Sequence, residues 1–297
     1  MGWVRFYFSR CWRFSMRDYY ELTKPRVVFL MIITAWVGMA LASPGWIPLW
    51  QFLWGTLGIA LSAGGAAVVN HLVEQKIDQR MQRTQNRPVA SGRISVIKAA
   101  WFAGGIGSLG FVILYWGTNP LTAWLTLLSQ LAYAFVYTLF LKHATPQNIV
   151  IGGIAGAMPP LLGWTAITGQ IDPHSLLLVL IIFAWTPPHF WALAIHRHQE
   201  YKASGLPMLP VTHGLAFTRL HIVLYTCLMI ATTWLPFATH LSGLPYFVGV
   251  NVINAIFLIQ VIHLYNSKKE AVALKTFYHS IGYLLVLFLL LLGDHYL

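Results

Sequence analysis

The chain has 297 residues, of which 57% are hydrophobic and 9% are charged, and its formal net charge is +11. Charged residues make up about a quarter of an ordinary soluble domain, so this composition excludes that class and indicates an integral membrane protein. The two cysteines, Cys11 and Cys227, lie far apart and lack a CxxC spacing, which argues against a disulfide framework and against a thiolate metal site.

The amino-terminal segment, residues 1–26, is rich in arginine and aromatic side chains. It lacks the short apolar core and the small-residue cleavage site of a signal peptide. Aromatic rings suit the interface of a bilayer, and arginines suit its anionic headgroups. We therefore predict an uncleaved cytoplasmic segment, followed by one transmembrane domain over residues 27–297.

Apolar segments long enough to cross a bilayer recur along the rest of the chain. A hydrocarbon core of about 30 Å requires roughly 20 apolar helical residues. Stretches with Pro, Gly and Asn, such as "SPGW", "GTNP" and "IDPH", separate the segments and mark turns. We predict an all-α protein with nine transmembrane helices, at 27–42, 49–69, 96–116, 121–141, 149–167, 175–195, 220–237, 246–264 and 278–292.

The placement of basic residues gives these helices an orientation. Cytoplasmic loops of membrane proteins are enriched in Lys and Arg. With the amino terminus inside, all 19 Lys and Arg fall at the cytoplasmic side, in residues 1–26, 70–95, 142–148, 196–219 and 265–277, and at Lys98. We therefore predict a multi-pass protein of the bacterial cytoplasmic (inner) membrane, with its carboxyl terminus on the outer side.

The first long cytoplasmic loop, residues 70–95, contains two of the eight carboxylates of the chain. Asn70, Glu74 and Asp78 share one face of a helix because residues four apart are neighbours on its surface. Oxygen ligands of this kind suit Mg²⁺, which proteins usually hold with one or two carboxylates while water and substrate phosphate complete the shell.

Arginines follow these oxygen ligands at positions 80, 83 and 87. The guanidinium group matches the oxygens of a phosphate, so the loop predicts a site for a metal-bridged diphosphate. The competing interpretation is a solvated interfacial helix, in which the two acids pair only with Lys76, Arg80 or His71.

A second cytoplasmic loop, after the sixth predicted helix, resembles the first. Aligning "PVASG" with "PVTHG" places Asp78 opposite Glu200, Glu74 opposite His196, and Asn70 opposite Ala192. Both loops follow helices that run toward the cytoplasm, as in two parallel four-helix units followed by a ninth helix. Residues 70–95 and 189–219 would then face each other across a central cavity open to the cytoplasmic side.

Two pairs of prolines predict breaks in the predicted helices. Pro187 and Pro188 remove backbone donors, so we expect non-helical backbone there, with His189 at the break. Pro159 and Pro160 mark a second break. His189 alone is compatible with a structural hydrogen bond or with a role as base or ligand.

Four stretches resemble a known family. The pattern "NxxxExxxDxxMxRTxxRPxxSGR" from Asn70 is similar to the first signature of the UbiA-type intramembrane prenyltransferases, which are related to enzymes of the ubiquinone pathway. Stretches starting at Leu22, Tyr137 and Trp185, the last reading "WTPPHFWALAIHRHQEYKASGLPMLPV", resemble the subfamily that uses heme as the acceptor. The resemblance is close over residues 22–211 and general beyond them.

The resemblance implies Mg²⁺-dependent transfer of a farnesyl group from farnesyl diphosphate to a vinyl group of heme B. Water adds in the same transformation, which gives heme O and releases diphosphate. Heme B would be a substrate, and a heme A synthase or the assembly of heme-copper oxidases would use the product downstream. The other partner is the lipid bilayer, and no nucleic acid is implied.

In that reaction Asn70, Glu74 and Asp78 would hold Mg²⁺, with Glu200 assisting, and these four residues would be the catalytic set. The residues expected to bind the diphosphate are Arg83, Arg87, Lys142 and Lys202. Those expected around the heme and the prenyl group are Trp185, His189, Phe190, Trp191 and His196, with Phe183 as a further candidate for the apolar wall. His189 would serve as an axial heme ligand or handle a proton.

One departure from the family pattern limits the metal prediction. The wider superfamily often has a second acidic pair in the loop after the sixth helix, whereas this chain has His196 opposite Glu74 and only Glu200 as an acid. We therefore expect one firmly held ion. The alternatives are a prenyltransferase for a quinone-precursor ring or another tetrapyrrole, and a membrane carrier, which also has many spans with helix breaks.

Overall fold

The computed structural model describes residues 16–267 and 269–297, and over these ranges the regular structure is helical, as predicted. The predicted amino-terminal segment lies mostly outside the described residues. The elements are α2 (Pro25–Leu41), α3 (Leu49–Val73), α4 (Gln75–Asp78), α5 (Val96–Gly117), α6 (Pro120–Leu131), the π-helix η1 (Ala132–Leu141), α7 (Lys142–Ala144), α8 (Asn148–Ala157), α9 (Pro159–Thr168), α10 (Pro173–His196), α11 (His198–Ala203), α12 (Leu209–Thr212), α13 (Gly214–Ala238), α14 (Leu244–Asn266) and α15 (Glu270–His295).

Within the described ranges, eight helical stretches are long and apolar enough to cross a membrane. A ninth is obtained if the helix Met16–Leu22 and α2, which meet at a bend of 51°, count as one span. Each predicted segment coincides with one of these helices or with α2. The multi-pass helical architecture is therefore confirmed, and the count of nine stays a prediction.

Several predicted turns become helix caps. Asn119 in "GTNP" accepts a hydrogen bond from the Thr122 amide at 2.9 Å, and Asp172 in "IDPH" accepts one from the His174 amide at 2.8 Å. A proline follows each cap at the first helical position, where its missing N–H costs nothing. These caps fix the start of α6 and of α10.

Close helix contacts hold the bundle together where side chains are small. A Cβ on Gly38 of α2 would collide with the backbone of Pro160 in α9, and one on Gly163 of α9 would collide with the backbone of Ala35 in α2. Small residues allow helices in a membrane to approach until their backbones touch. The second proline pair marks a real break, because α8 ends at Ala157 and α9 begins at Pro159.

The break predicted at Pro187 and Pro188 is wrong. The helix α10 runs from Pro173 to His196 through both prolines, so His189 lies inside a continuous helix. Packing explains the difference, because α10 contacts α8, α13 and α15 along its length. Buried transmembrane helices tolerate proline when neighbouring helices pack against them.

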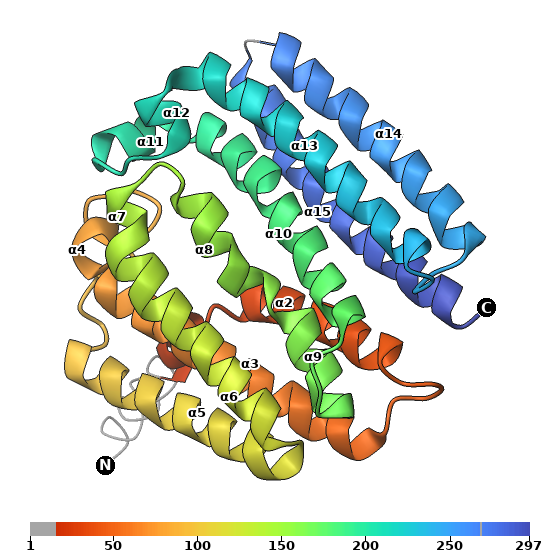
Figure 1. Cartoon of the computed structure of the whole chain (residues 1–297). Helices are drawn as coiled ribbons and strands as arrows, with labels where there is room; N and C mark the ends of the chain where they lie inside the picture. Colours follow the sequence, from red (N-terminus) through yellow and green to blue (C-terminus); the bar gives the residue numbers. More distant parts are fainter. Residues whose placement is uncertain (1–15, 268) are drawn as a thin grey trace, which may run out of the picture.

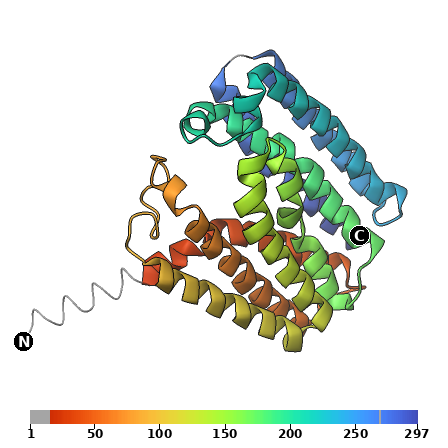
Figure 2. The ribbon, with the colours of Figure 1, turned by 60° about the vertical axis from the view of Figure 1, so that its left-hand side comes forward.

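The arrangement of the helices places the polar loops together. Figure 1 shows the short helices α4, α7, α11 and α12 gathered at one end of the bundle, beside the ends of α3 and α10. In Figure 2, α3 and α5 lie on one side of the molecule, α13 and α14 on the other, and α8 to α10 between them. The close packing of α3 with α5 and of α10 with α13 is the pairing that a parallel repeat predicts, although the repeat itself stays a prediction.

Candidate active site

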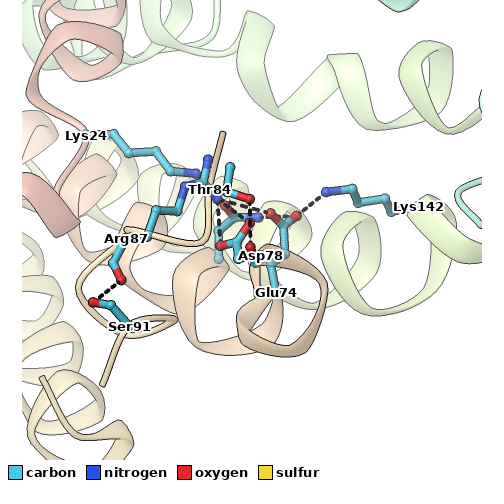
Figure 3. Close-up of polar contacts among 8 residues, drawn as sticks. Lys24, Glu74, Asp78, Thr84, Arg87, Ser91 and Lys142 are labelled. Carbon is cyan, nitrogen blue, oxygen red and sulfur yellow. Dashed lines mark hydrogen bonds and ion pairs between the residues drawn. The ribbon is translucent and has the colours of Figure 1, made fainter. Parts of the chain in front are cut away.

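A compact group of charged and amide side chains lies where α3 ends, and we call it the polar cluster (Figure 3). Its members come from the start of α2, the end of α3, α4, the loop after α4, and α7. They are Lys24, Asn70, Glu74, Asp78, Arg87 and Lys142.

The path of the backbone keeps the three oxygen-bearing side chains together. The helix α3 ends at Val73 and α4 covers Gln75–Asp78, with Glu74 between them at φ −84° and ψ 1°. Hydrogen bonds from the Glu74 amide to the Asn70 carbonyl (3.0 Å) and from the Asp78 amide to the Glu74 carbonyl (2.8 Å) continue the i to i+4 spacing. The side-chain amide of Asn70 donates to Glu74 Oε1 at 2.8 Å.

Three basic side chains contact these oxygens. Arg87 Nη1 lies 2.8 and 2.7 Å from the two carboxylate oxygens of Asp78 and 3.7 Å from Glu74 Oε2. Lys142 pairs with Glu74 Oε1, and Lys24 donates to Asn70 Oδ1. Two carboxylates therefore share three cations, which leaves the polar cluster with a formal positive charge and able to receive an anion.

The side chains that carry these oxygens are buried, so their ionised groups need partners. Asn70, Glu74 and Asp78 are only 2%, 6% and 3% exposed, and a buried ionised group is costly unless it is paired. Burial alone raises the pKa of Glu74, but attraction to Lys142 and Lys24, with hydrogen bonds from Lys142 and Asn70, outweighs it and leaves that pKa below its usual value. Glu74 is accordingly ionised at neutral pH.

The competing interpretation, a solvated helix, does not describe this arrangement. The partners of the two acids come from other segments, with Lys142 lying 68 positions from Glu74. Lys76 and Arg80, the local partners that this interpretation requires, are exposed to solvent. Contacts between distant segments of the chain therefore form the polar cluster.

The loop after α4 folds back and fixes the position of Arg87. Thr84 Oγ1 donates to the Asp78 carbonyl at 3.1 Å, and the side-chain amide of Gln79 donates to the Ala90 carbonyl at 3.0 Å. Ser91 Oγ donates to the carbonyl of Arg87 itself at 2.9 Å (Figure 3). These bonds fix the backbone on both sides of the guanidinium that contacts Asp78.

The loop after α10 contributes no member to the polar cluster. Glu200 pairs with Arg197 at 3.4 Å, and Lys202 is exposed. Neighbouring protein atoms desolvate part of the Arg83 guanidinium, and this, followed by repulsion from Arg197 and Arg87, lowers the pKa of Arg83, although the residue as a whole is exposed. Within the described residues no group of three or more His, Cys, Asp or Glu side chains is assembled, so Glu200 does not complete the predicted four-residue metal site in this structure.

The comparison with protein families decides the classification, because the UbiA prenyltransferase family matches residues 31–291. The chain belongs to the UbiA prenyltransferase family.

Curated relatives of this UbiA-family chain carry one name. The chain is 62% identical over 283 residues to a protein named protoheme IX farnesyltransferase from Marinobacter nauticus, covering 95% of this chain and 93% of the relative. Proteins of the same name from Legionella pneumophila (57% identical, covering 94% and 95%) and Shewanella denitrificans (54% identical, covering 97% and 96%) are also similar.

Solved structures share the fold at low sequence identity. A structure described as digeranylgeranylglyceryl phosphate synthase superposes with a TM-score of 0.79 at 18% identity, covering 94% of this chain and 98% of that one. A UbiA homologue from Archaeoglobus fulgidus bound to GPP and Mg²⁺ superposes with a TM-score of 0.62 at 14% identity, covering 92% and 99%. These structures support the fold of this UbiA-family chain.

The aromatic residues expected to form one apolar wall do not gather in one place. Trp185 and His189 stack on each other, with ring centroids 4.2 Å apart, and His189 Nδ1 lies 2.6 Å from Ser280 Oγ on α15. Trp191 is fully buried against Tyr225 of α13, with ring centroids 5.1 Å apart. Phe190 is 41% exposed.

These residues therefore point to different neighbours of α10. The cause is the unbroken helix, because consecutive positions of a regular helix face different directions. The remaining members of the predicted pocket set are Phe183, which is partly buried, and His196, whose Nδ1 is buried without a hydrogen-bond partner.

The sequence interpretation missed several residues around the polar cluster. Lys24 was not a candidate, although it stands in the "LTKPR" stretch that resembles the family. Tyr133 and Tyr137 also escaped notice, although they lie on η1, which packs against α3 and ends directly before Lys142. The sequence signal available was the spacing of four residues between the two tyrosines, shortly before Lys142.

Proposed function

We propose that this chain transfers the farnesyl group of farnesyl diphosphate to a vinyl group of heme B, with addition of water, and so forms heme O and diphosphate. The names of relatives that are 54–62% identical over almost the whole chain support the assignment. The observation that carries the chemistry is the polar cluster, in which three cations surround two buried carboxylates.

The basic members of the polar cluster suit a diphosphate leaving group. When the bond between the allylic carbon and oxygen breaks, negative charge develops on the diphosphate, and fixed cations stabilise that charge. Arg87 and Lys142 would bind the phosphate oxygens and release the carboxylates that they contact in the free protein, and Lys24 would release the amide oxygen of Asn70. Arg83 borders the same loop and would extend the basic surface, whereas Lys202 is exposed and would contribute to it from the second loop.

The oxygen donors of the polar cluster fit Mg²⁺. One amide oxygen and two carboxylates form a hard ligand set, which Mg²⁺ completes with water and substrate phosphate. Asn70, Glu74 and Asp78 would hold the ion, with Glu200 acting through water. When bound, Mg²⁺ would neutralise charge on the diphosphate as a Lewis acid. The A. fulgidus homologue bound to GPP and Mg²⁺ supports this part of the proposal.

The location follows from the charge distribution. The protein would lie in the bacterial inner membrane with the polar cluster at the cytoplasmic side, where both loops and their basic residues meet. The heme propionates would face this basic end, and the product would pass to a heme A synthase or to oxidase assembly.

The test is incubation of the purified protein with heme B, Mg²⁺ and prenyl diphosphates of ten, fifteen or twenty carbons, followed by mass spectrometry of the heme. We expect a farnesylated, hydrated heme only when metal and the fifteen-carbon diphosphate are both present. Parallel incubations with a quinone-precursor acid test the alternative acceptor. Prenylation of that acid without modification of heme would overturn the proposal.

A further inference from the structure

Two tyrosines lie beside the polar cluster and have no assigned role. Tyr133 and Tyr137 stack with ring centroids 5.6 Å apart and ring planes at 21°. Both are half-buried. They belong to η1, which packs against α3 and ends directly before Lys142, the residue whose ammonium group contacts Glu74.

The helix that carries them has an unusual geometry. The segment Ala132–Leu141 is a π-helix that packs against α3, the helix that carries Asn70 and ends before Glu74. Thr138 Oγ1 donates to the Tyr133 carbonyl five residues earlier at 2.8 Å. π-Helical turns are rare and occur frequently at functional sites.

Local packing holds the tyrosine pair in place. Gly152 of α8 lies directly against the ring of Tyr137, where a Cβ would collide with the ring atoms. Lys142, whose ammonium group contacts Glu74, follows η1 without a gap. The π-helix therefore positions two aromatic rings and one diphosphate-binding cation on the same side of the bundle.

We propose that the stacked rings of Tyr133 and Tyr137 lie beside the allylic carbon of the prenyl diphosphate and stabilise the carbocation formed there. This inference rests on the proposed function. The carbon–oxygen bond breaks and its electron pair leaves with the diphosphate, so the positive charge develops next to the polar cluster. A cation over an aromatic face is stabilised by the ring quadrupole, most strongly where water is excluded.

The rest of the transfer balances around that cation. The π electrons of the heme vinyl group form the new carbon–carbon bond to the allylic carbon, and the other vinyl carbon becomes cationic. Water adds to it and releases a proton to solvent. The tyrosine rings protect the first cation from premature capture by water, which would give farnesol instead of the transferred product.

The position of the tyrosines favours them over the aromatic residues of α10. Trp185 packs with His189 toward α15, and Trp191 packs toward α13, whereas the helix of Tyr133 and Tyr137 packs against α3 and leads directly into Lys142, which contacts Glu74. The charge of the cation and that of the departing diphosphate must be close in space, so the stabilising rings must lie next to the polar cluster.

The test compares Tyr133→Phe and Tyr137→Phe with Tyr133→Leu and Tyr137→Leu. Phe keeps the ring, so we expect kcat within about threefold of the parent. Leu removes the ring, so we expect kcat to fall about 30-fold or more with little change in the KM of farnesyl diphosphate, and the ratio of farnesol to prenylated heme to rise. Phe135→Leu, which removes an exposed ring from the same π-helix, is the matched control.

Each other result overturns the inference. Equal losses in the Phe and Leu variants would assign the effect to the hydroxyl groups, and a rise in KM with unchanged kcat would assign it to ground-state binding. Unchanged product ratios in a folded Leu variant, verified by its elution and thermal unfolding in detergent, would also refute it. Failure of the parent to prenylate heme would refute the proposed function instead.

Discussion

At the scale of single residues, the polar cluster explains why a chain with so few acids buries two of them together. Glu74 and Asp78 are satisfied by Lys142 and Arg87, so their burial is stable without a bound ion. Removing one partner of a buried ion pair is costly, because it leaves the other charge unpaired. The same contacts position cations where a diphosphate needs them.

Arg87 is the cation whose loss should be most visible. We predict that Arg87→Met lowers kcat/KM for farnesyl diphosphate by about 100-fold, the usual cost of removing one donor that stabilises transition-state charge. Arg80→Met is the matched control, since Arg80 is exposed on the same loop and should stay within about threefold of the parent. Steady-state kinetics measure both, and equal effects of the two substitutions would contradict the assignment.

Glu74 and Asp78 are the two carboxylates proposed to hold Mg²⁺. We predict that a chelator abolishes heme prenylation by the parent, that Mg²⁺ restores it, and that the double variant Glu74→Gln, Asp78→Asn shows no stimulation by Mg²⁺ because its ligands have lost their charge. Titration of activity against Mg²⁺ is the measurement, with Glu270→Gln, an exposed acid, as control. Stimulation of the double variant to the parent level would exclude these residues as the metal site.

At the scale of elements, local patterns predicted some structures and packing decided others. The oxygen ladder from Asn70 to Asp78 follows from helical spacing, and the loop with Arg87 follows it directly, so both could be read from the sequence. Two prolines predict a break equally well at 159–160 and at 187–188, but the helix is interrupted only at 159–160. The helix α10 stays continuous while packed against α8, α13 and α15, and a sequence pattern does not contain such contacts.

The π-helix was also beyond sequence reasoning. Hydropathy predicted one regular span over residues 121–141, whereas the helix changes from α6 to η1 at Ala132, in a segment where Tyr137 packs against Gly152 of α8. Lys24 joins the polar cluster from 46 positions away for a similar tertiary reason.

The contact between α2 and α9 can be tested by adding one methyl group at Gly38. We predict that Gly38→Ala destabilises the protein by about 1–3 kcal/mol, the usual cost of overpacking a tight contact, because its Cβ would meet the backbone of Pro160. Gly45→Ala is the control, since a Cβ there meets nothing within 4 Å. Thermal unfolding in detergent should show a lower midpoint for Gly38→Ala alone. An unchanged midpoint would mean that the helices separate at no cost.

At the scale of the whole molecule, charge and hydropathy together predict an oriented bundle. The basic segments of the described residues lie toward the end of the bundle that carries α4, α7, α11 and α12, and the turns without Lys or Arg lie toward the opposite end (Figure 1). Figure 1 shows α4 of the first loop and α11 and α12 of the second at the same end of the bundle, and the prediction that the two loops face each other across a cavity stays a prediction.

Orientation in the membrane can be tested with two engineered thiols. In a background with Cys11→Ser and Cys227→Ser, Ser91→Cys places a thiol on the exposed surface of the basic end, and Gly45→Cys places one in the exposed turn between α2 and α3. Because Lys and Arg are retained on the cytoplasmic side, a membrane-impermeant maleimide added to intact spheroplasts should label Gly45→Cys at once and Ser91→Cys only after permeabilisation. The reverse pattern would place the polar cluster on the outer face, away from a cytoplasmic supply of prenyl diphosphate.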